Sequence, residues 1–439
     1  MQTIDFTHDP GKTSWVESAN GHSDFPIQNL PLGRFALADG RPRVGVAIGE
    51  HIVDLGSLRA MGLLPLPGAL GQELEELLFS ASDAVGLTAA ARLALRHEVF
   101  RVLDGQGPQG EVARRRQGEF LRASADCTLL LPSQVRNYSD FNAGIYHSAR
   151  GGLRRGRPMA EALLPNYRHV PIGYHGRASS VQPSGTDIRR PWGQIVPAGA
   201  SQPVFEPSRK VDFELELGIW IGRGNPAGQP IPVGQAAAHI AGYSLLNDWS
   251  ARDIQSWESE RLGPFLGKSF GTTVSPWIIT PEALAPFRLP AFTRAATDPQ
   301  PLDYLLDAAD QADGGLDLSL AVHLQPAGVT DTFTLSRSHA RYLYWTPAQI
   351  VAHQTSNGCN LQVGDVLGTG TISGPGADEF GALLDAYDAT RSKLSFSGFE
   401  RTFLSDGDQA MLEARAHREG RVSIGFGPCR GQILPAVSR

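Results

Sequence analysis

Apolar and polar residues alternate in short runs near the start of the chain. In 31–56, apolar runs are separated by Asp-Gly and Gly-Glu turns, which predicts two or three short antiparallel strands. From Leu74 to Leu103 the apolar positions recur at helical spacing, with a break at 80–88. The glycine-rich, charged segment 106–122 is interpreted as a boundary. We therefore expect a small β-rich domain with trailing helices at 1–131.

The remainder, 132–439, has patterns typical of many strands and few helices. Strands are predicted within 211–222, 242–250, 364–374 and 421–436, and a short helix is predicted at 234–242. Ser250 is a candidate cap for a helix that runs through Trp257. These elements predict a mainly β protein of the α+β class, with 132–439 as its second domain.

Composition narrows the class of protein. The chain has 439 residues, 41% of them apolar and 19% charged, with 49 Gly and 31 Pro, as in turn-rich globular proteins. The net charge of -6 gives no indication of a nucleic-acid or membrane-surface partner. The three cysteines are far apart and form no CxxC pair. Because neither a membrane span nor a signal peptide is visible, we expect a soluble, cytoplasmic protein.

Three acids alternate with apolar residues in one predicted strand. Asp212, Glu214 and Glu216 would share a face of that strand, because side chains two residues apart point the same way. Neighbouring carboxylates repel each other unless a cation neutralises them, and a hard divalent cation does this well. Asp248 and Asp140 would then complete a cage for Mg²⁺ or Ca²⁺. The alternative is a half-buried strand with a solvated acidic face.

Two further segments carry candidate chemistry. The segment 247–273 combines Asp248, Arg252, Gln255 and Lys268, a set that suits metal binding and the stabilisation of negative charge. The alternative is a polar helix followed by a Gly-Pro turn. His147 is a candidate general base, although many histidines are surface or packing residues.

The loop 174–180 places Tyr174, His175 and Arg177 close together. This cluster fits recognition of an anionic substrate, and a hydrogen-bonded structural loop is the alternative. Gly267-Lys268-Ser269 is not a P-loop, because the required earlier glycine is missing. No Ser–His–acid motif or GxSxG elbow is visible, so a serine triad fits less well.

Several separate segments together resemble the fumarylacetoacetate hydrolase family. They include DFPIQNLPLGRF at 24–35, ALLPN at 162–166, VPIGYHGRASS at 170–180, SGTDIRRPWGQ at 184–194, NDWSARDIQ at 247–255, GPFLGKSFGTT at 263–273, NGCNL at 357–361 and GTISG at 370–374. The resemblance runs nearly the whole length. It implies a small SH3-like N-terminal barrel, a larger C-terminal mixed β-sandwich roll, and a homodimer.

The resemblance also implies an activity. This is hydrolysis of the carbon–carbon bond of 4-fumarylacetoacetate to fumarate and acetoacetate, the last step of tyrosine and phenylalanine degradation. The implied cofactor is Mg²⁺, Ca²⁺ or both. One alternative is a related fumarylpyruvate or acylpyruvate hydrolase, hydratase or decarboxylase, although these usually lack the N-terminal domain. Another is a catalytically dead metal-binding dimer.

The resemblance assigns roles to named positions. The implied metal contacts are Asp140, Glu214, Glu216, Asp248, Lys268 and Thr272. The implied catalytic residues are His147 as general base, Asp385 as its partner, and Lys268, Arg252 and Gln255 for the departing enolate. The implied substrate contacts are Asn142, Arg157, Tyr174, Arg252, Gln255, Ser259 and Thr371. Arg157 lies beyond a one-residue insertion.

Three positions depart from the family pattern. Asn142 and Ser259 stand where the family has tyrosines, so the shape of the substrate could differ. Asp385 stands near the family's glutamate and is one methylene shorter. Glu379 is the alternative partner for His147.

Overall fold

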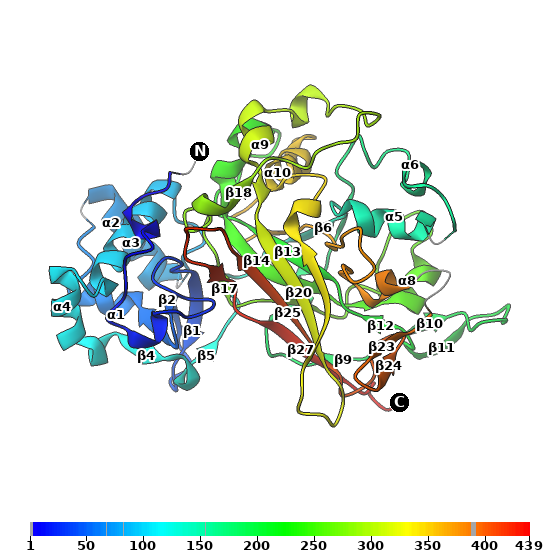
Figure 1. Ribbon diagram of the computed structural model, residues 1–439, viewed down its shortest axis with the longest axis horizontal. Helices are drawn as coiled ribbons and strands as arrows, with labels where there is room; N and C mark the ends of the chain where they lie inside the picture. Colours follow the sequence, from blue (N-terminus) through cyan, green and yellow to red (C-terminus); the bar gives the residue numbers. More distant parts are fainter. Residues whose placement is uncertain (1–2, 67, 82, 154, 388–391) are drawn as a thin grey trace.

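The computed structural model describes residues 3–66, 68–81, 83–153, 155–387 and 392–439. Strands predominate among them, which confirms the predicted mainly β class (Figure 1). Within these residues the larger sheets are two of six strands and one of seven.

The N-terminal sheet has the strand order β17-β1-β2-β3-β4, with β5 beside β1. Its strands are β1 (Leu32–Ala36), β2 (Pro42–Ile48), β3 (His51–Asp54), β4 (Leu121–Ala123), β5 (Thr128–Leu129) and β17 (Trp277–Ile278). The three strands predicted in 31–56 are thus confirmed as β1, β2 and β3. The helices of this part are α1 (Leu55–Ala60), α2 (Gly68–Glu75), α3 (Ala89–Leu103) and α4 (Pro108–Arg115).

The interpretation of 106–122 as a boundary is wrong. Helix α4 occupies much of this segment and contacts α3, and the chain then enters β4, which pairs with β3. Proline at the first turn of α4 is compatible with a helix, because its missing N–H would have no intrahelical partner there. The charges of 106–122 therefore belong to a packed helix and not to a linker.

The N-terminal sheet is joined to the rest of the chain by backbone pairing and by a buried ion pair. β17 comes from much later in the sequence and pairs antiparallel with β1. Arg92 on α3 binds Glu282 at 2.9 Å, and both side chains are buried. The two parts of the chain thus share one sheet.

The seven-stranded sheet has the order β7-β6-β22-β13-β14-β16-β8. Its strands are β6 (Tyr138–Phe141), β7 (Gly173–His175), β8 (Val181–Pro183), β13 (Leu215–Ile221), β14 (Ile240–Asp248), β16 (Thr272–Val274) and β22 (Val366–Gly368). It is mixed, because β22 runs parallel to β6, and β16 runs parallel to β8. The predicted strands within 211–222, 242–250 and 364–374 are confirmed as β13, β14 and β22.

The third large sheet has the order β21-β20-β25-β27-β9, with β26 beside β25. Its strands are β9 (Ile188–Arg189), β20 (Leu318–Gln325), β21 (Phe333–His339), β25 (Gln409–Ala416), β26 (Ile424–Gly425) and β27 (Cys429–Leu434). Smaller ribbons pair β10 (Trp192–Ile195) with β11 (Val204–Pro207), β12 (Val211–Asp212) with β15 (Ser250–Ala251), β18 (Arg288–Leu289) with β19 (Gly315–Leu316), and β23 (Leu394–Phe396) with β24 (Phe399–Arg401).

The remaining α-helices cover the ends and sides of these sheets (Figure 1). They are α5 (Ile145–Leu153), α6 (Met159–Ala162), α7 (Val233–Ala236), α8 (Arg252–Glu258), α9 (Ala308–Asp313) and α10 (Pro347–Thr355). The prediction that Ser250 caps the helix through Trp257 is wrong. Ala251 is the N-cap of α8, and the Ser250 hydroxyl instead donates to the backbone carbonyl of Asp248.

The main hydrophobic core lies between the two C-terminal sheets, where β14 contacts β25 and β27. Leu217 and Ile219 of β13 and Leu245 of β14 belong to this core. Because side chains alternate along a strand, the even-numbered positions 216–220 of β13 and 244–248 of β14 face the other way. That second face carries the acids Glu216 and Asp248, and it is where the candidate site forms.

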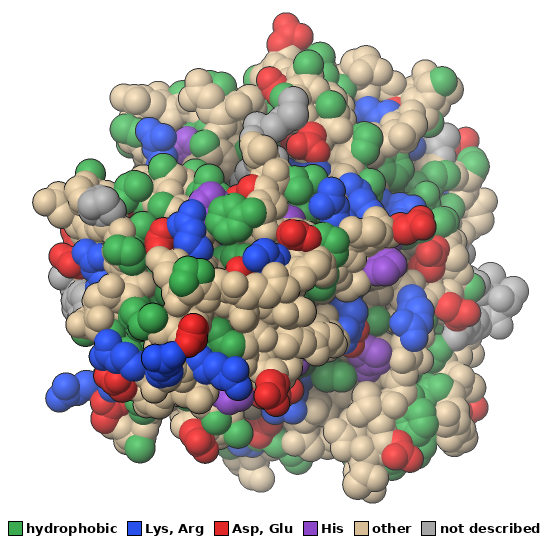
Figure 2. Space-filling view, turned by 60° about the vertical axis from the view of Figure 1, so that its left-hand side comes forward, with side chains coloured by type: hydrophobic (Ala, Val, Ile, Leu, Met, Phe, Trp, Pro, Cys, Tyr) green, Lys and Arg blue, Asp and Glu red, His purple; other side chains and the backbone are tan. Residues whose placement is uncertain are grey.

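None of the helices within the described residues has the length and apolar character needed to cross a membrane. On the face shown in Figure 2, basic and acidic side chains are interspersed.

Candidate active site

Four carboxylates meet on the second face of the seven-stranded sheet. Asp140 lies on β6, Glu216 on β13 and Asp248 on β14, while Glu214 lies in the link between β12 and β13. One oxygen from each lies within 4.8 Å of the others, and all four residues are buried. The alternative of a solvated acidic face on this strand is therefore wrong.

Gly368 makes the approach of two of these acids possible. It lies on β22, between the strands that carry Asp140 and Glu216, and pairs directly with Asp140. A Cβ atom at Gly368 would lie 2.3 Å from Asp140 Oδ1 and 3.0 Å from Glu216 Oε2. A larger residue would therefore force the carboxylates apart, and the missing side chain is part of the site.

Two buried cations neutralise one side of the cluster. Lys268 Nζ donates to Asp248 Oδ2 at 2.6 Å and also to Glu214. Arg252 on α8 donates from Nη1 to Glu214 Oε1 at 2.7 Å. Burial opposes ionisation of Glu214, but Lys268 and Arg252 more than offset it and hold its pKa below the ordinary value. Glu214 is therefore a charged, fully paired carboxylate.

Two hydroxyl groups also bond to Asp248. Tyr174 on β7 donates to Asp248 Oδ2 at 2.7 Å, and Thr272 on β16 donates to Asp248 Oδ1 at 3.4 Å. Burial and the nearby carboxylates raise the pKa of Tyr174, so its hydroxyl keeps the proton that it donates.

The other side of the cluster has no such partners. Asp140 Oδ1 and Glu216 Oε1 are buried, and no hydrogen-bond donor is placed against either atom. Burial, followed by the neighbouring carboxylates, raises the pKa of both acids well above the ordinary value. Converging carboxylate oxygens with an excess of negative charge are the donor set that hard divalent cations prefer. The cluster could therefore hold a metal ion.

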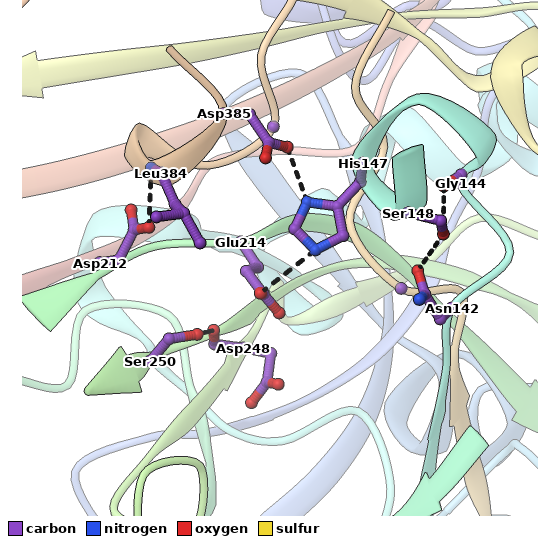
Figure 3. A network of polar contacts seen from close by, with 12 residues as sticks. Asn142, Gly144, His147, Ser148, Asp212, Glu214, Asp248, Ser250, Leu384 and Asp385 are labelled. Atoms are coloured by element: carbon purple, nitrogen blue, oxygen red, sulfur yellow. Dashed lines mark hydrogen bonds and ion pairs between the residues drawn. The ribbon is translucent and has the colours of Figure 1, made fainter. Parts of the chain in front are cut away.

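His147 lies beside the cluster, on α5. Its Nδ1 is 2.6 Å from Asp385 Oδ2, and its Nε2 is 3.9 Å from Glu214 Oε1 (Figure 3). Because the carboxylate can only accept at Nδ1, the ring donates there, and in a neutral imidazole this leaves the lone pair on Nε2. Burial opposes ionisation of Asp385, but His147 and the Ser373 hydroxyl outweigh this and lower its pKa.

Glu379 makes different contacts. It accepts from the Tyr342 hydroxyl at 3.0 Å and from the Gly376 backbone N–H at 2.7 Å. The carboxylate that contacts His147 is therefore that of Asp385.

A cavity of about 520 Å³ opens onto these groups. Its lining includes the predicted site residues Asp140, Asn142, His147, Tyr174, Glu214, Glu216, Gln255, Ser259, Lys268 and Thr371. The hydroxyls of Ser259 and Thr371 are buried and have no hydrogen-bond partner. Leu164 and Leu262 also line the cavity, and both are largely exposed. The cavity thus combines a charged interior, unpaired polar groups and apolar side chains at the solvent side.

Five predicted site residues lie outside this lining. Asp248, Arg252 and Asp385 are buried behind residues that line the cavity, to which each of them bonds, and Thr272 is buried behind Asp248. Arg157 is exposed, in the segment between α5 and α6. The structure therefore does not bring Arg157 to the cavity.

Four residues that shape the site or its cavity were not identified from the sequence. They are Gly368, Ser373 and the apolar pair Leu164 and Leu262. A glycine inside a predicted strand is a signal of close approach, and it could have indicated Gly368. The others had no local signal.

The N-terminal and C-terminal parts of the chain both match known protein families. Residues 28–132 match the family model described as Fumarylacetoacetase N-terminal, and residues 145–434 match Fumarylacetoacetate (FAA) hydrolase C-terminal. A fumarylacetoacetase of Rattus norvegicus is 41% identical over 418 residues, covering 95% of this chain and 97% of that protein. One of Arabidopsis thaliana is 43% identical over 419 residues, covering 94% and 96%. One of Homo sapiens is 41% identical, covering 94% and 97%.

Proposed function

The chain belongs to the fumarylacetoacetate hydrolase family, and we propose that it hydrolyses 4-fumarylacetoacetate to fumarate and acetoacetate. It is a hydrolase whose relatives, named fumarylacetoacetases, match it over nearly their whole length. The observation that carries the proposal is one cavity lined by three acids of the four-carboxylate cluster and by a histidine that a buried acid orients.

We propose that the four carboxylates hold a divalent cation, Mg²⁺ or Ca²⁺. Asp140, Glu214, Glu216 and Asp248 would supply oxygen ligands, with Lys268 and Thr272 beside them. When bound, such a cation supplies Lewis-acid polarisation of the carbonyl oxygens of a β-diketone. The unpaired oxygens of Asp140 and Glu216 support this assignment.

His147 is the proposed general base. Its Nε2 would accept a proton from water, whose oxygen then bonds to the carbonyl carbon of the fumaryl group. Asp385 accepts from Nδ1, which holds the ring in the tautomer that leaves Nε2 free. The same carboxylate stabilises the imidazolium that forms, because it places a negative charge 2.6 Å from Nδ1.

The bond between that carbonyl carbon and the methylene then breaks, and its electron pair stays with acetoacetate as an enolate. Lys268, Arg252 and Gln255 are the proposed groups that stabilise this charge. Arg252 Nη2 is buried without a hydrogen-bond partner, so one face of the guanidinium retains an unused donor. The proton that His147 Nε2 took from water then goes to the enolate carbon, which gives acetoacetate and returns the imidazole to its neutral form.

Substrate orientation is assigned to polar residues of the cavity. Tyr174, Gln255, Thr371, Asn142 and Ser259 line it, and two of the hydroxyls have no other partner. Arg157 is also a proposed substrate contact, but it does not line the cavity. It is exposed, and its segment would need to move toward the cavity. We also propose a homodimer in the cytoplasm, on the resemblance to the family, and light scattering tests the dimer.

The direct test is product identity. Purified protein with Mg²⁺ and 4-fumarylacetoacetate should release fumarate and acetoacetate in equal amounts, and chromatography of the products measures both. Release of neither product would refute the proposed function and favour the alternative of a catalytically dead metal-binding dimer.

A second candidate is a related acylpyruvate or fumarylpyruvate hydrolase. The observation that favours it is the pair Asn142 and Ser259, which line the cavity with small polar side chains. Competition between 4-fumarylacetoacetate and fumarylpyruvate distinguishes the two functions. We expect the higher kcat/KM for 4-fumarylacetoacetate, and the reverse order would favour the second candidate.

A further inference from the structure

Asp212 is an acid that the proposed mechanism does not use. It belongs to β12 and is fully buried, but it is not a member of the four-carboxylate cluster. The chain leaves strand geometry after β12 and enters β13 at Leu215, so Asp212 does not share the orientation of Glu216. Its partners must therefore be sought elsewhere.

Each oxygen of Asp212 has two donors. Oδ1 accepts from the backbone N–H groups of Phe213 at 2.9 Å and Leu383 at 2.8 Å. Oδ2 accepts from Arg252 Nε at 2.9 Å. It also accepts from the backbone N–H of Leu384 at 3.0 Å (Figure 3). One carboxylate thus joins the guanidinium of Arg252 to a turn from the far end of the sequence.

That turn carries the partner of His147. Leu383–Ala386 is a short 3₁₀ helix, η11, and Asp385 is its third residue. The first N–H groups of a helix lack intrahelical partners, and the residue before η11, Ala382, has no side chain that could cap them. Asp212 supplies the missing acceptor from another part of the chain. The N–H groups that it binds lie one and two residues before Asp385.

We propose that Asp212 is a positioning residue that sets Arg252 and the Asp385-bearing turn relative to each other. This inference rests on the proposed function and deepens it. The Asp385–His147 contact is 2.6 Å, so a shift of the turn would misdirect His147 Nε2. A displacement near 1 Å can cost about 10² in rate.

The substitution Asp212→Asn tests this with little change of volume. The amide turns one acceptor oxygen into an NH₂ group, which would then face two N–H donors. It must lose either the Phe213 and Leu383 pair or the Arg252 and Leu384 pair. We expect kcat to fall about 10- to 100-fold.

Asp408 offers a matched control. It too is fully buried, and it accepts from Arg401 at 2.7 and 2.9 Å, from the Ala327 N–H at 3.0 Å and from the Ser405 N–H at 2.9 Å. Asp408→Asn therefore removes the same kind of buried carboxylate away from the cavity. Its cost in thermal stability should resemble that of Asp212→Asn, but its kcat should stay near the wild-type value.

A double-mutant cycle with Asp385→Asn separates positioning from a general structural role. If Asp212 acts through Asp385, the double variant should match Asp385→Asn in kcat within about threefold. If the two losses in kcat multiply, the inference is wrong. Should Asp212→Asn fail to fold, Asp212→Glu keeps the charge and is measured in the same cycle, with a smaller loss expected.

Amide hydrogen exchange gives a readout that is independent of turnover. Asp212→Asn should accelerate exchange at Leu383 or Leu384, whichever loses its acceptor, and Asp408→Asn should accelerate neither. Unchanged exchange at both amides would overturn the inference, even if the wild-type protein did not act on 4-fumarylacetoacetate. An inactive wild type with accelerated exchange would instead refute the proposed function alone.

Discussion

The two halves of the carboxylate cluster differ in how the chain neutralises them. Lys268 forms ion pairs with both Glu214 and Asp248, and Arg252 forms a further ion pair with Glu214. Asp140 and Glu216 lie equally deep, yet each has a buried oxygen without a donor. Burial raises the pKa of both acids well above the ordinary value and also raises the pKa of Asp248, whereas the pKa of Glu214 is lowered. The difference indicates that the protein itself balances the negative charge of Glu214 and Asp248, and that a bound cation would balance Asp140 and Glu216.

A third kind of buried carboxylate extends this comparison. Asp385 also has a partner on a buried oxygen, but this partner is a histidine that lines the cavity. Pairing thus has two uses in the site. It stabilises charge next to the proposed cation, and it orients the proposed base.

The largest effect is expected for His147→Ala. Loss of a general base should lower kcat by about 10² to 10⁴, while cation binding persists because the four carboxylates remain. Steady-state kinetics and calorimetry with Mg²⁺ measure the two properties on the same preparation. Turnover near the wild-type rate would remove His147 from the mechanism.

Substitutions at Asp385 should come next. Asp385→Asn keeps the shape but removes the charge that supports an imidazolium, so we expect kcat to fall by about 10². Asp385→Glu restores the residue of the family and should retain substantial activity. Glu379→Gln is the matched control, because Glu379 bonds to Tyr342 and not to His147. Loss of activity in the control with a harmless Asp385→Asn would reverse the assignment.

Glu214→Gln tests the paired half of the cluster. The amide would leave Lys268 or Arg252 facing an NH₂ group, and a hydrogen bond to a charged group is typically worth about 1.5–3 kcal/mol. We expect the free energy of unfolding of the metal-free protein to fall by an amount in that range, and Mg²⁺ affinity to fall as well. Denaturant unfolding in EDTA measures the first quantity. Unchanged stability and affinity would contradict the pairing described here.

Glu216→Gln should have a smaller effect, of opposite sign, on the metal-free protein. The raised pKa means that folding near neutral pH must either protonate Glu216 or bury its charge. The amide avoids this cost, so the free energy of unfolding should rise by about 1 kcal/mol in EDTA. Mg²⁺ affinity should nevertheless fall, because a ligand oxygen loses its charge. If Glu216→Gln and Glu214→Gln destabilise the metal-free protein equally, the two halves do not differ.

Much of the fold could be predicted from alternation alone. The strands β13 and β14 carry apolar residues at every second position toward the core, and their ranges were visible in the sequence. Asp212 shows the limit of this reasoning. The alternation assigned it to one face with Glu214 and Glu216, but the period of two applies only while the strand continues. Between β12 and β13 the strand is interrupted, and Asp212 turns to Arg252.

Local sequence patterns predicted less of the site than of the fold. His147 and Asp385 are separated by 238 residues, so only the resemblance to the family connected them. Gly368 acts by lacking a side chain between Asp140 and Glu216, a role that depends on the order of three strands. Strand order is a tertiary property, and local patterns do not encode it.

The central claim is that one divalent cation, held beside Asp140 and Glu216, is required for hydrolysis. Its most direct test is turnover of 4-fumarylacetoacetate by protein stripped with EDTA, as Mg²⁺ or Ca²⁺ is returned in measured amounts. We predict negligible turnover in the stripped protein, and recovery that reaches its plateau at one bound cation per chain. Full turnover by stripped protein, shown by elemental analysis to be free of metal, would contradict the claim.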